Sequence, residues 1–225
     1  MKFILSLILA PFLCFAPGAF AQLAKTPEMA LIAAAEEGDA ADVRRLLAAG
    51  VSMNARDARG RTALLAATHA NRIETARLLI DAGSDVNAQD AIKDSPFLYA
   101  GAEGRLEILR LMLTGTRSRP DFKLLNRYGG NALIPACHHG HVETVRELLK
   151  TDIPVDFVNS LGWTALLETV ILGDGSARYV EITKLLLARG ATVSLADRDG
   201  VTPLAHALRR GHRAVAEVLR AAGGK

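Results

Sequence analysis

The sequence has almost no excess of either charge. Its 225 residues include 27 Lys and Arg against 24 Asp and Glu, a formal net charge of +3. The basic residues are interleaved with acidic ones, so the sequence does not favour nucleic acid as a partner. Half of the residues are hydrophobic and 23% are charged, which is typical of a globular protein and argues against a disordered or fibrous one.

Several motifs of enzyme chemistry are also absent. The sequence contains no Gly-rich phosphate loop, no G-x-S-x-G nucleophile elbow and no H-E-x-x-H zinc motif. Cysteine is scarce, with only Cys14 and Cys137. Cys14 falls in an N-terminal segment that we expect to be removed, so we predict no intramolecular disulfide in the mature chain.

Residues 1–21 have the features of a secretory signal peptide. Lys2 gives a short positive start, an apolar run extends over residues 3–15, and Ala19-Phe20-Ala21 matches an A-x-A cleavage site. We therefore predict cleavage before Gln22 and a periplasmic or secreted protein.

The sequence disfavours two other fates of this N-terminal segment, a retained membrane helix and a lipid anchor. A retained membrane helix needs roughly 20 uninterrupted apolar residues, and Pro11 and Pro17 interrupt this run. Lipidation of Cys14 needs a small residue before it, where this chain has Leu13. The sequence therefore predicts no stable membrane insertion after signal cleavage.

The rest of the chain is periodic. Six related tripeptides begin 33, 33, 36, 33 and 38 residues apart, at Met29, Thr62, Ser95, Asn131, Thr164 and Thr202. Each tripeptide is followed by a small residue and a polar break, and then by a second apolar stretch. A glycine such as Gly50 or Gly83 then ends the second stretch, as a left-handed helix terminus does. The pattern predicts two helices per unit.

The T-P-L-type opening, the 33-residue period and the Asp85-Val86-Asn87-Ala88 tail resemble the ankyrin repeat. The resemblance implies an all-α solenoid of about six helix-turn-helix units with short β-turn tips, because no unit can bury its apolar face alone. It covers residues 22–225 as one ankyrin repeat domain, with units near 27–57, 58–90, 91–126, 127–159, 160–197 and 198–225. Hydroxyl or amide side chains cap the first helix of five units, whereas Met29 cannot cap the first unit.

Two units carry insertions, around residues 115–120 and 173–178. Their Gly, Ser and Pro residues predict surface loops. Such loops often lie on the binding side of a repeat array, although a tolerated insertion without function explains them equally well.

The stretch from Asn126-Arg127-Tyr128-Gly129-Gly130 through Trp163 to Gly173-Asp174-Gly175 is similar to exported proteobacterial ankyrin proteins. Some exported bacterial ankyrin proteins are associated with catalase and peroxide resistance. The resemblance therefore implies a peroxide-protection role as an alternative, which no residue of this stretch demonstrates.

The densest group of potential ligands is Cys137-His138-His139-Gly140-His141. A zinc site needs about four convergent ligands, whereas consecutive helical residues point in different directions. The Gly-His pair also matches the ankyrin pattern, which implies histidines that hold loop backbone. Thiol catalysis by Cys137 lacks a suitably spaced carboxylate. We predict no metal, no cofactor and no catalytic residue, with a metal-binding protein as the alternative.

The ankyrin resemblance places partner binding on a concave face made of the turn tips and the exposed ends of the first helices. Aromatic and Arg anchors dominate interface energy, and the aromatic and apolar residues here would form a centre flanked by arginines at both ends of the array. The predicted partner-binding residues are Arg59, Arg61, Ile92, Tyr128, Leu161, Trp163, Ile171, Leu172, Arg209 and Arg210. An alternative for Trp163 is packing on the neighbouring tip. The sequence thus predicts a non-enzymatic module that binds a periplasmic protein of unspecified identity.

Overall fold

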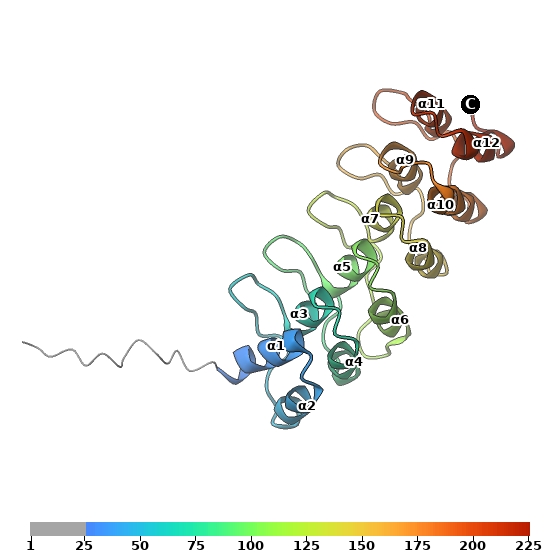
Figure 1. Cartoon of the computed structure of the whole chain (residues 1–225). Coiled ribbons are helices and arrows are strands. Elements are labelled where there is room, and N and C mark those ends of the chain that lie inside the picture. The colour runs from blue at the N-terminus through green and yellow to red at the C-terminus, as the bar shows by residue number, and fades with distance from the viewer. Residues whose placement is uncertain (1–25) are drawn as a thin grey trace, which may run out of the picture.

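The computed structural model describes residues 26–225, so the predicted signal sequence lies outside the described residues. Within this range the chain forms twelve helices and no strands (Figure 1). The helices are α1 Pro27–Glu37, α2 Ala40–Ala48, α3 Ala63–His69, α4 Ile73–Ala82, α5 Pro96–Ala102, α6 Leu106–Thr114, α7 Leu133–His138, α8 Val142–Leu148, α9 Ala165–Ile171, α10 Ala177–Ala188, α11 Pro203–Arg209 and α12 Arg213–Ala221. From residue 26 onward, none of them has the length and apolar character needed to cross a membrane.

The twelve helices form six antiparallel pairs that stack in chain order. The first helix of each pair packs on the first helix of the next, from α1 to α11, and the second helices form a parallel row from α2 to α12. Figure 1 shows the two rows, with the loops between pairs projecting to one side. The predicted all-α array of about six units is confirmed.

Side-chain caps begin the first helix of most pairs. Thr62 Oγ1 accepts a hydrogen bond from Leu65 N at 3.3 Å, and Ser95 Oγ accepts one from Leu98 N at 3.2 Å. In the first unit, the prediction that Met29 stands at the cap position is wrong. The cap is Thr26, three residues earlier, and Met29 N donates to its hydroxyl at 3.3 Å. The first helix therefore starts one turn earlier than its counterparts.

The core runs continuously through the stack. The small residues predicted after each tripeptide are all buried: Ala34, Ala67, Ala100, Ala136, Thr169 and Ala207. Leu133, the last residue of the fourth tripeptide, has no exposed surface. Small side chains let successive helices approach closely, while the leucines fill the space between pairs. The predicted register of the units is thus supported by burial.

The loops between pairs share one hydrogen-bonded turn, which we call the tip: residues 57–61, 90–94, 126–130, 159–163 and 197–201. The first residue of each tip is Asp or Asn, and its Oδ1 accepts two backbone N–H groups at 2.9 to 3.0 Å. This side-chain turn fixes the tip without a sheet. Lys93 has a φ of 64° where the other tips place glycine.

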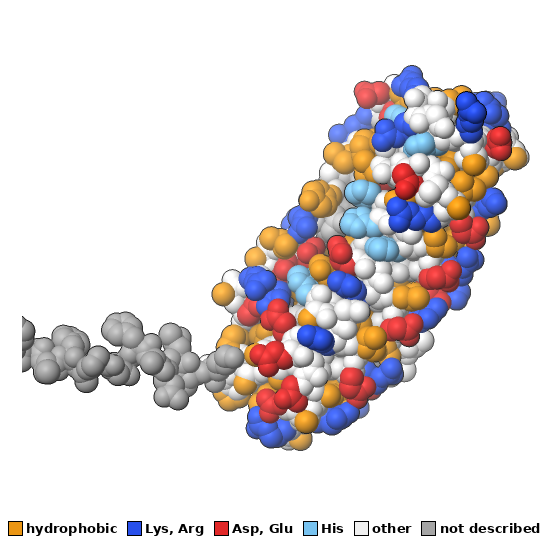
Figure 2. Space-filling view, in the orientation of Figure 1, with side chains coloured by type: hydrophobic (Ala, Val, Ile, Leu, Met, Phe, Trp, Pro, Cys, Tyr) orange, Lys and Arg blue, Asp and Glu red, His pale blue; other side chains and the backbone are white. Residues whose placement is uncertain are grey.

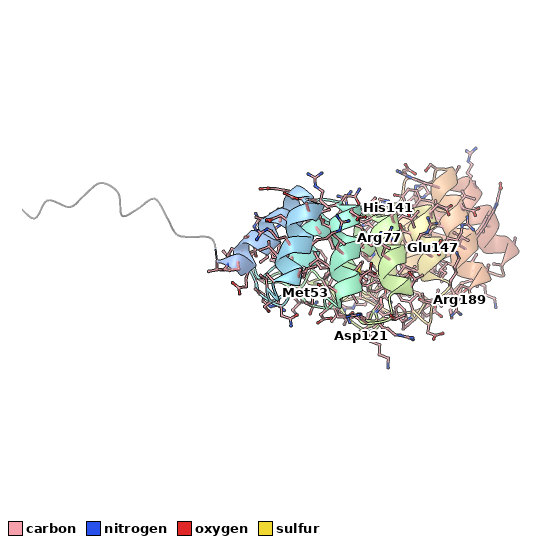
Figure 3. All side chains as sticks on the ribbon, turned by 90° about the horizontal axis from the view of Figure 1, so that it is seen from below. Met53, Arg77, Asp121, His141, Glu147 and Arg189 are labelled. Carbon is pink, nitrogen blue, oxygen red and sulfur yellow. The ribbon has the colours of Figure 1, made fainter. Side chains whose placement is uncertain are left out.

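Ion pairs link the second helices across unit boundaries. Arg110 of α6 lies 2.9 Å from Glu147 of α8, and Arg44 of α2 lies 2.6 Å from Glu74 of α4. Figure 3 shows Arg77 and Glu147 on this row of helices, with His141 at the edge where the helices begin and Arg189 at the opposite edge. Among residues 26–225, the outer row is therefore a charged surface bridged between α2 and α4, α6 and α8, and α8 and α10.

The two insertions lie in different places. Residues 115–120 pack back onto the second unit, where Ser118 Oγ accepts from Val86 N at 3.2 Å. Residues 173–176 join α9 to α10, and residues 177–178 form the start of α10 just before Tyr179, whose hydroxyl donates to the carbonyl oxygen of His138 at 2.8 Å. Gly173 is required here, because a Cβ would lie 2.3 Å from Thr169 O. Both insertions are surface loops, as predicted, and only the second adjoins the site described next.

Candidate functional site

A pocket of about 360 Å³ opens where the tips of the third to fifth units meet the ends of their first helices. We call the surface formed by the tips and these helix ends the tip face. Figure 2 shows histidine side chains gathered near the middle of the array. The pocket is lined by Asp94, Tyr99, Ala102, Glu103, Asn126, Arg127, Tyr128, Gly130, Ile134, Pro135, His138, His139, Asn159, Leu161, Glu168 and Leu172.

The most unusual lining residue is Glu168, which lies within the apolar run of α9. Its residue surface is only 5% exposed. Asn159 Nδ2 donates to Glu168 Oε1 at 2.9 Å, and Glu168 Oε2 lies 3.6 Å from His138 Nδ1. Burial raises the pKa of Glu168 to about 7, and the hydrogen bond from Asn159 opposes this only in part. The pocket therefore contains a carboxyl group that titrates near neutral pH.

Two histidines at the end of α7 form another wall of the pocket. Burial and the neighbouring His139 lower the pKa of His138, so His138 favours its neutral form. The rings of His138 and His139 meet edge to face, with centroids 4.7 Å apart. The hydrogen bond from Tyr179 to the His138 carbonyl holds this turn of the chain in place.

Arg127, in the tip of the fourth unit, is the only arginine among residues 26–225 that lines the pocket. Arg127 Nη1 lies 3.5 Å from Asp94 Oδ2, and the guanidinium carbon lies 5.3 Å from the centre of the Tyr128 ring. Burial raises the pKa of Asp94, although Arg127 opposes the shift. Glu103 lines the same wall and forms no ion pair with any residue in the range 26–225. The pocket thus holds more carboxyl groups than cationic ones.

The predicted partner-binding residues divide into four groups, of which the last, Arg61 and Ile171, is buried. The pocket brings together Tyr128, Leu161 and Leu172, all of which are exposed on its rim. Arg59, Arg209 and Arg210 are also exposed, but on other units, and Ile92 is exposed on the tip of the third unit without lining this pocket. Trp163 is half-buried and does not line the pocket, so its role in binding stays a prediction.

Arg61 and Ile171 were placed wrongly on the binding surface. Arg61 is only 4% exposed because its guanidinium pairs with Asp57 at 2.8 Å and with Glu36 of the first unit at 2.9 Å. It joins two units and is not available to a partner. Ile171 is 9% exposed, because the last turn of α9 directs it toward the protein interior.

The group from Cys137 to His141 does not converge on one point. Cys137 is completely buried, and burial raises the pKa of its thiol, which disfavours the reactive thiolate. Across residues 26–225, no three His, Cys, Asp or Glu side chains are arranged to hold a metal ion.

The sequence analysis did not select Glu168, Asn159 or Tyr99. A signal for Glu168 was present, since a charged residue interrupts the apolar run Leu166-Leu167-Glu168-Thr169-Val170. A charged side chain on the buried face of a repeat needs a partner or a pocket. That reasoning identifies the residue, but not the neighbours that surround it.

Comparison with known proteins agrees with this architecture. The family model described as ankyrin repeats in three copies matches residues 8–90 and 97–193. The chain belongs to the ankyrin repeat family. Ankyrin repeat proteins are typically non-catalytic scaffolds that bind other proteins.

Several relatives extend over nearly the whole chain. YahD of Escherichia coli (strain K12) is 41% identical over 191 residues, covering 84% of this chain and 94% of YahD. The crystal structure of an ankyrin repeat domain from Acinetobacter baumannii AYE is 52% identical, with a TM-score of 0.83, and covers 87% of this chain and 98% of that one. The ankyrin repeat protein EF0377 is 42% identical, with a TM-score of 0.82 over 86% of this chain and 97% of its own. Bacterial homologues thus share the whole array.

Proposed function

We propose that this ankyrin protein is an exported interaction module that binds a protein partner in the periplasm through its tip face. The observation that carries the proposal is a row of large apolar side chains at equivalent tip positions. Ile92, Tyr128 and Leu161 are 51%, 61% and 52% exposed on three successive tips. Neighbouring exposed apolar side chains of this kind mark interaction surfaces.

The direction of these side chains follows from the tip turn. The Asp or Asn at the start of each tip binds the backbone and leaves the residue two positions later pointing outward. Tyr128 is an aromatic residue with a polar end, of the kind that dominates interface energy. The proposed surface therefore has its centre at the third to fifth units.

Affinity capture from periplasmic extract tests the binding half of the proposal. The bait is the purified protein, compared with the double variant Tyr128→Ala/Leu161→Ala. Ile73→Ala is the matched control, since Ile73 is also exposed but begins α4 in the outer row. We expect a partner that is captured by the wild type and the control and lost by the double variant. Equal capture by all three proteins would contradict a binding site on the tips.

Trp163 gives a second test of the same surface. If it contacts the partner, Trp163→Ala weakens binding by about 2 kcal/mol or more, as truncation of an interface anchor does. Titration calorimetry against the captured partner measures the affinity, and urea denaturation measures the stability of the same variant. Unchanged affinity together with a large loss of stability would assign Trp163 to packing on its neighbouring tip.

Export is tested separately. Mass spectrometry of the native protein is expected to find Gln22 at its N-terminus, because Ala19-Phe20-Ala21 matches a signal peptidase site. An intact Met1 or a lipid on Cys14 would contradict the proposed export. Neither result would bear on the proposed binding surface.

A further inference from the structure

The charges that line the pocket do not balance. Among the residues from 26 onward, its walls carry the carboxyl groups of Asp94, Glu103 and Glu168 against the single guanidinium of Arg127. Arg127 is occupied by Asp94, at 3.5 Å. His138 lies near Glu168, but burial lowers the pKa of His138, which opposes the formation of a charged pair. The negative charge of the pocket is therefore not fully balanced, and one more positive charge would be favourable there.

Glu168 is placed to accept that charge. Its Oε1 is held by Asn159 at 2.9 Å, whereas its Oε2 accepts no hydrogen bond from residues 26–225. Ionised carboxylates are costly to bury unless they are paired. Glu168 is only 5% exposed, and its carboxyl group is fixed on one side by Asn159 and open toward the pocket on the other. It can therefore bind a positively charged hydrogen-bond donor.

The rim of the pocket suits an aliphatic stem. Tyr128, Leu161 and Leu172 are exposed large hydrophobic residues that also line the opening. Lysine and arginine side chains lay their methylene groups along apolar surface and project a charged end. A basic side chain that enters between these residues would contact them with its stem and Glu168 with its head.

We propose that the pocket receives a lysine or arginine side chain from a segment of the partner protein, and that Glu168 pairs with its cation. This inference rests on the proposed function, because the pocket opens between the tips that carry the apolar row. Tyr128 and Leu161 belong to both features, so one bound segment can cover the row and insert one side chain.

Other ligand chemistries fit the pocket less well. An anion would face the three carboxyl groups, with the one guanidinium already paired. A metal ion would need a convergent set of ligands, and the described part of the chain provides none. An uncharged apolar side chain would leave Glu168 with only its hydrogen bond from Asn159 and no positive charge beside it, which is unfavourable when the carboxyl group is ionised.

Proton linkage gives the inference a distinctive signature. A cation favours the ionised form of Glu168, so binding strengthens as the pH rises through the range in which this carboxyl group titrates. The other groups that face the pocket are His138 and His139 from the end of α7, Asp94 and Arg127 from two tips, and Glu103 from the end of α5. Several charged and titratable groups thus share the pocket, so the contribution of Glu168 must be isolated with a variant.

The experiment is a nuclear magnetic resonance titration of the purified protein with two acetylated tripeptide amides. One peptide has arginine between two leucines, and the other has citrulline, the neutral isostere of arginine, at the same place. We expect the arginine peptide to bind at least about tenfold more tightly, as expected for a hydrogen-bonded charged contact. Its affinity is expected to rise between about pH 6 and about pH 8.

Two variants provide the controls. Glu168→Gln keeps the size of the side chain and removes its charge, so it should abolish the preference for arginine over citrulline. Glu217→Gln removes the same charge from an exposed position on α12, outside the pocket, and should leave the preference unchanged. Equal affinity for the two peptides, a preference that survives in Glu168→Gln, or no binding of the arginine peptide at about 10 mM would each overturn the inference.

The outcomes separate this inference from the proposed function. If the partner needs Tyr128 and Leu161 but binds Glu168→Gln with unchanged affinity, the proposed function stands and the inference that the pocket receives a basic side chain is wrong. If the arginine peptide binds as expected but Tyr128→Ala/Leu161→Ala captures the same proteins as the wild type, the pocket still binds a basic side chain. The row of apolar residues on the tips is then not the partner surface.

Discussion

Removing the charge of Glu168 is expected to change the pH dependence of folding. The pKa of this group rises from the usual 4.5 to about 7 in the folded protein because burial disfavours the carboxylate. Below pH 4.5 the group is protonated in both states, and its stabilising contribution is complete. As the pH rises toward 7, the unfolded chain releases a proton that the folded protein retains, so this contribution is lost. At higher pH both states are ionised, and the burial of the charge opposes folding in full.

The magnitude follows from the size of the shift. Each pKa unit corresponds to about 1.4 kcal/mol, so the whole effect is about 3 kcal/mol. Glu168→Gln cannot ionise, and its amide oxygen can still accept the hydrogen bond from Asn159. We therefore expect the variant to be more stable than the wild type above neutral pH, and the difference to widen by about 2 to 3 kcal/mol between about pH 5 and about pH 8.

Urea denaturation of both proteins at several pH values measures this difference. The other charged groups of the pocket are present in both proteins, so the comparison isolates the charge of Glu168 together with its coupling to His138, which lies 3.6 Å away. Glu217→Gln shows the effect of removing a carboxylate from an exposed surface. If the difference in unfolding free energy between Glu168→Gln and the wild type stays constant with pH, or narrows as the pH rises, then burial does not raise the pKa of Glu168.

Three other substitutions or reactions test the fold. Leu133→Ala removes a completely buried side chain and should cost roughly 2 to 5 kcal/mol in urea denaturation; a loss below about 0.5 kcal/mol would place Leu133 at the surface. Lys93→Gly should raise stability in thermal denaturation by about 0.5 to 1 kcal/mol, because Lys93 holds a φ of 64° that glycine adopts without strain; a decrease would show that this tip is relaxed with lysine. Cys137 should resist a thiol reagent in the folded protein and react in urea, since burial hides the thiol and raises its pKa; rapid labelling of the folded protein would reveal access to the core.

The fold was predictable because each unit repeats a local pattern. The spacing of the tripeptides set the register, and the small residues and leucines that follow them are buried as expected. The error at Met29 arose from assuming that the first unit follows the others. Thr26 and Pro27 form an equally good helix start one turn earlier. Interior units are constrained by two neighbours, whereas a terminal unit has one and can depart from the pattern.

The site was less predictable because its contacts join residues far apart in sequence. Arg61 was expected on the surface, but the carboxylate of Glu36, 25 residues earlier, reaches it across the unit boundary. Asn159 donates a hydrogen bond to Glu168, nine residues later, only because the tip folds back toward α9. His138 lies near the same carboxyl group from the preceding helix pair. A repeat pattern gives the position of a side chain within its unit. It does not give the partners that the adjacent unit supplies.

The bridges between successive second helices have a consequence for how the array opens. Each bridge, such as Arg110 with Glu147, reaches only the adjacent unit. An end pair is therefore freed by separating one interface, whereas a central pair requires two. Amide hydrogens of α11 and α12 should exchange with deuterium sooner than those of α5 and α7, and fraying should advance inward from the C-terminal end. The pocket is lined by α5, α7 and α9, in the stretch that we expect to exchange most slowly, so we expect its surface to be ordered before a partner binds.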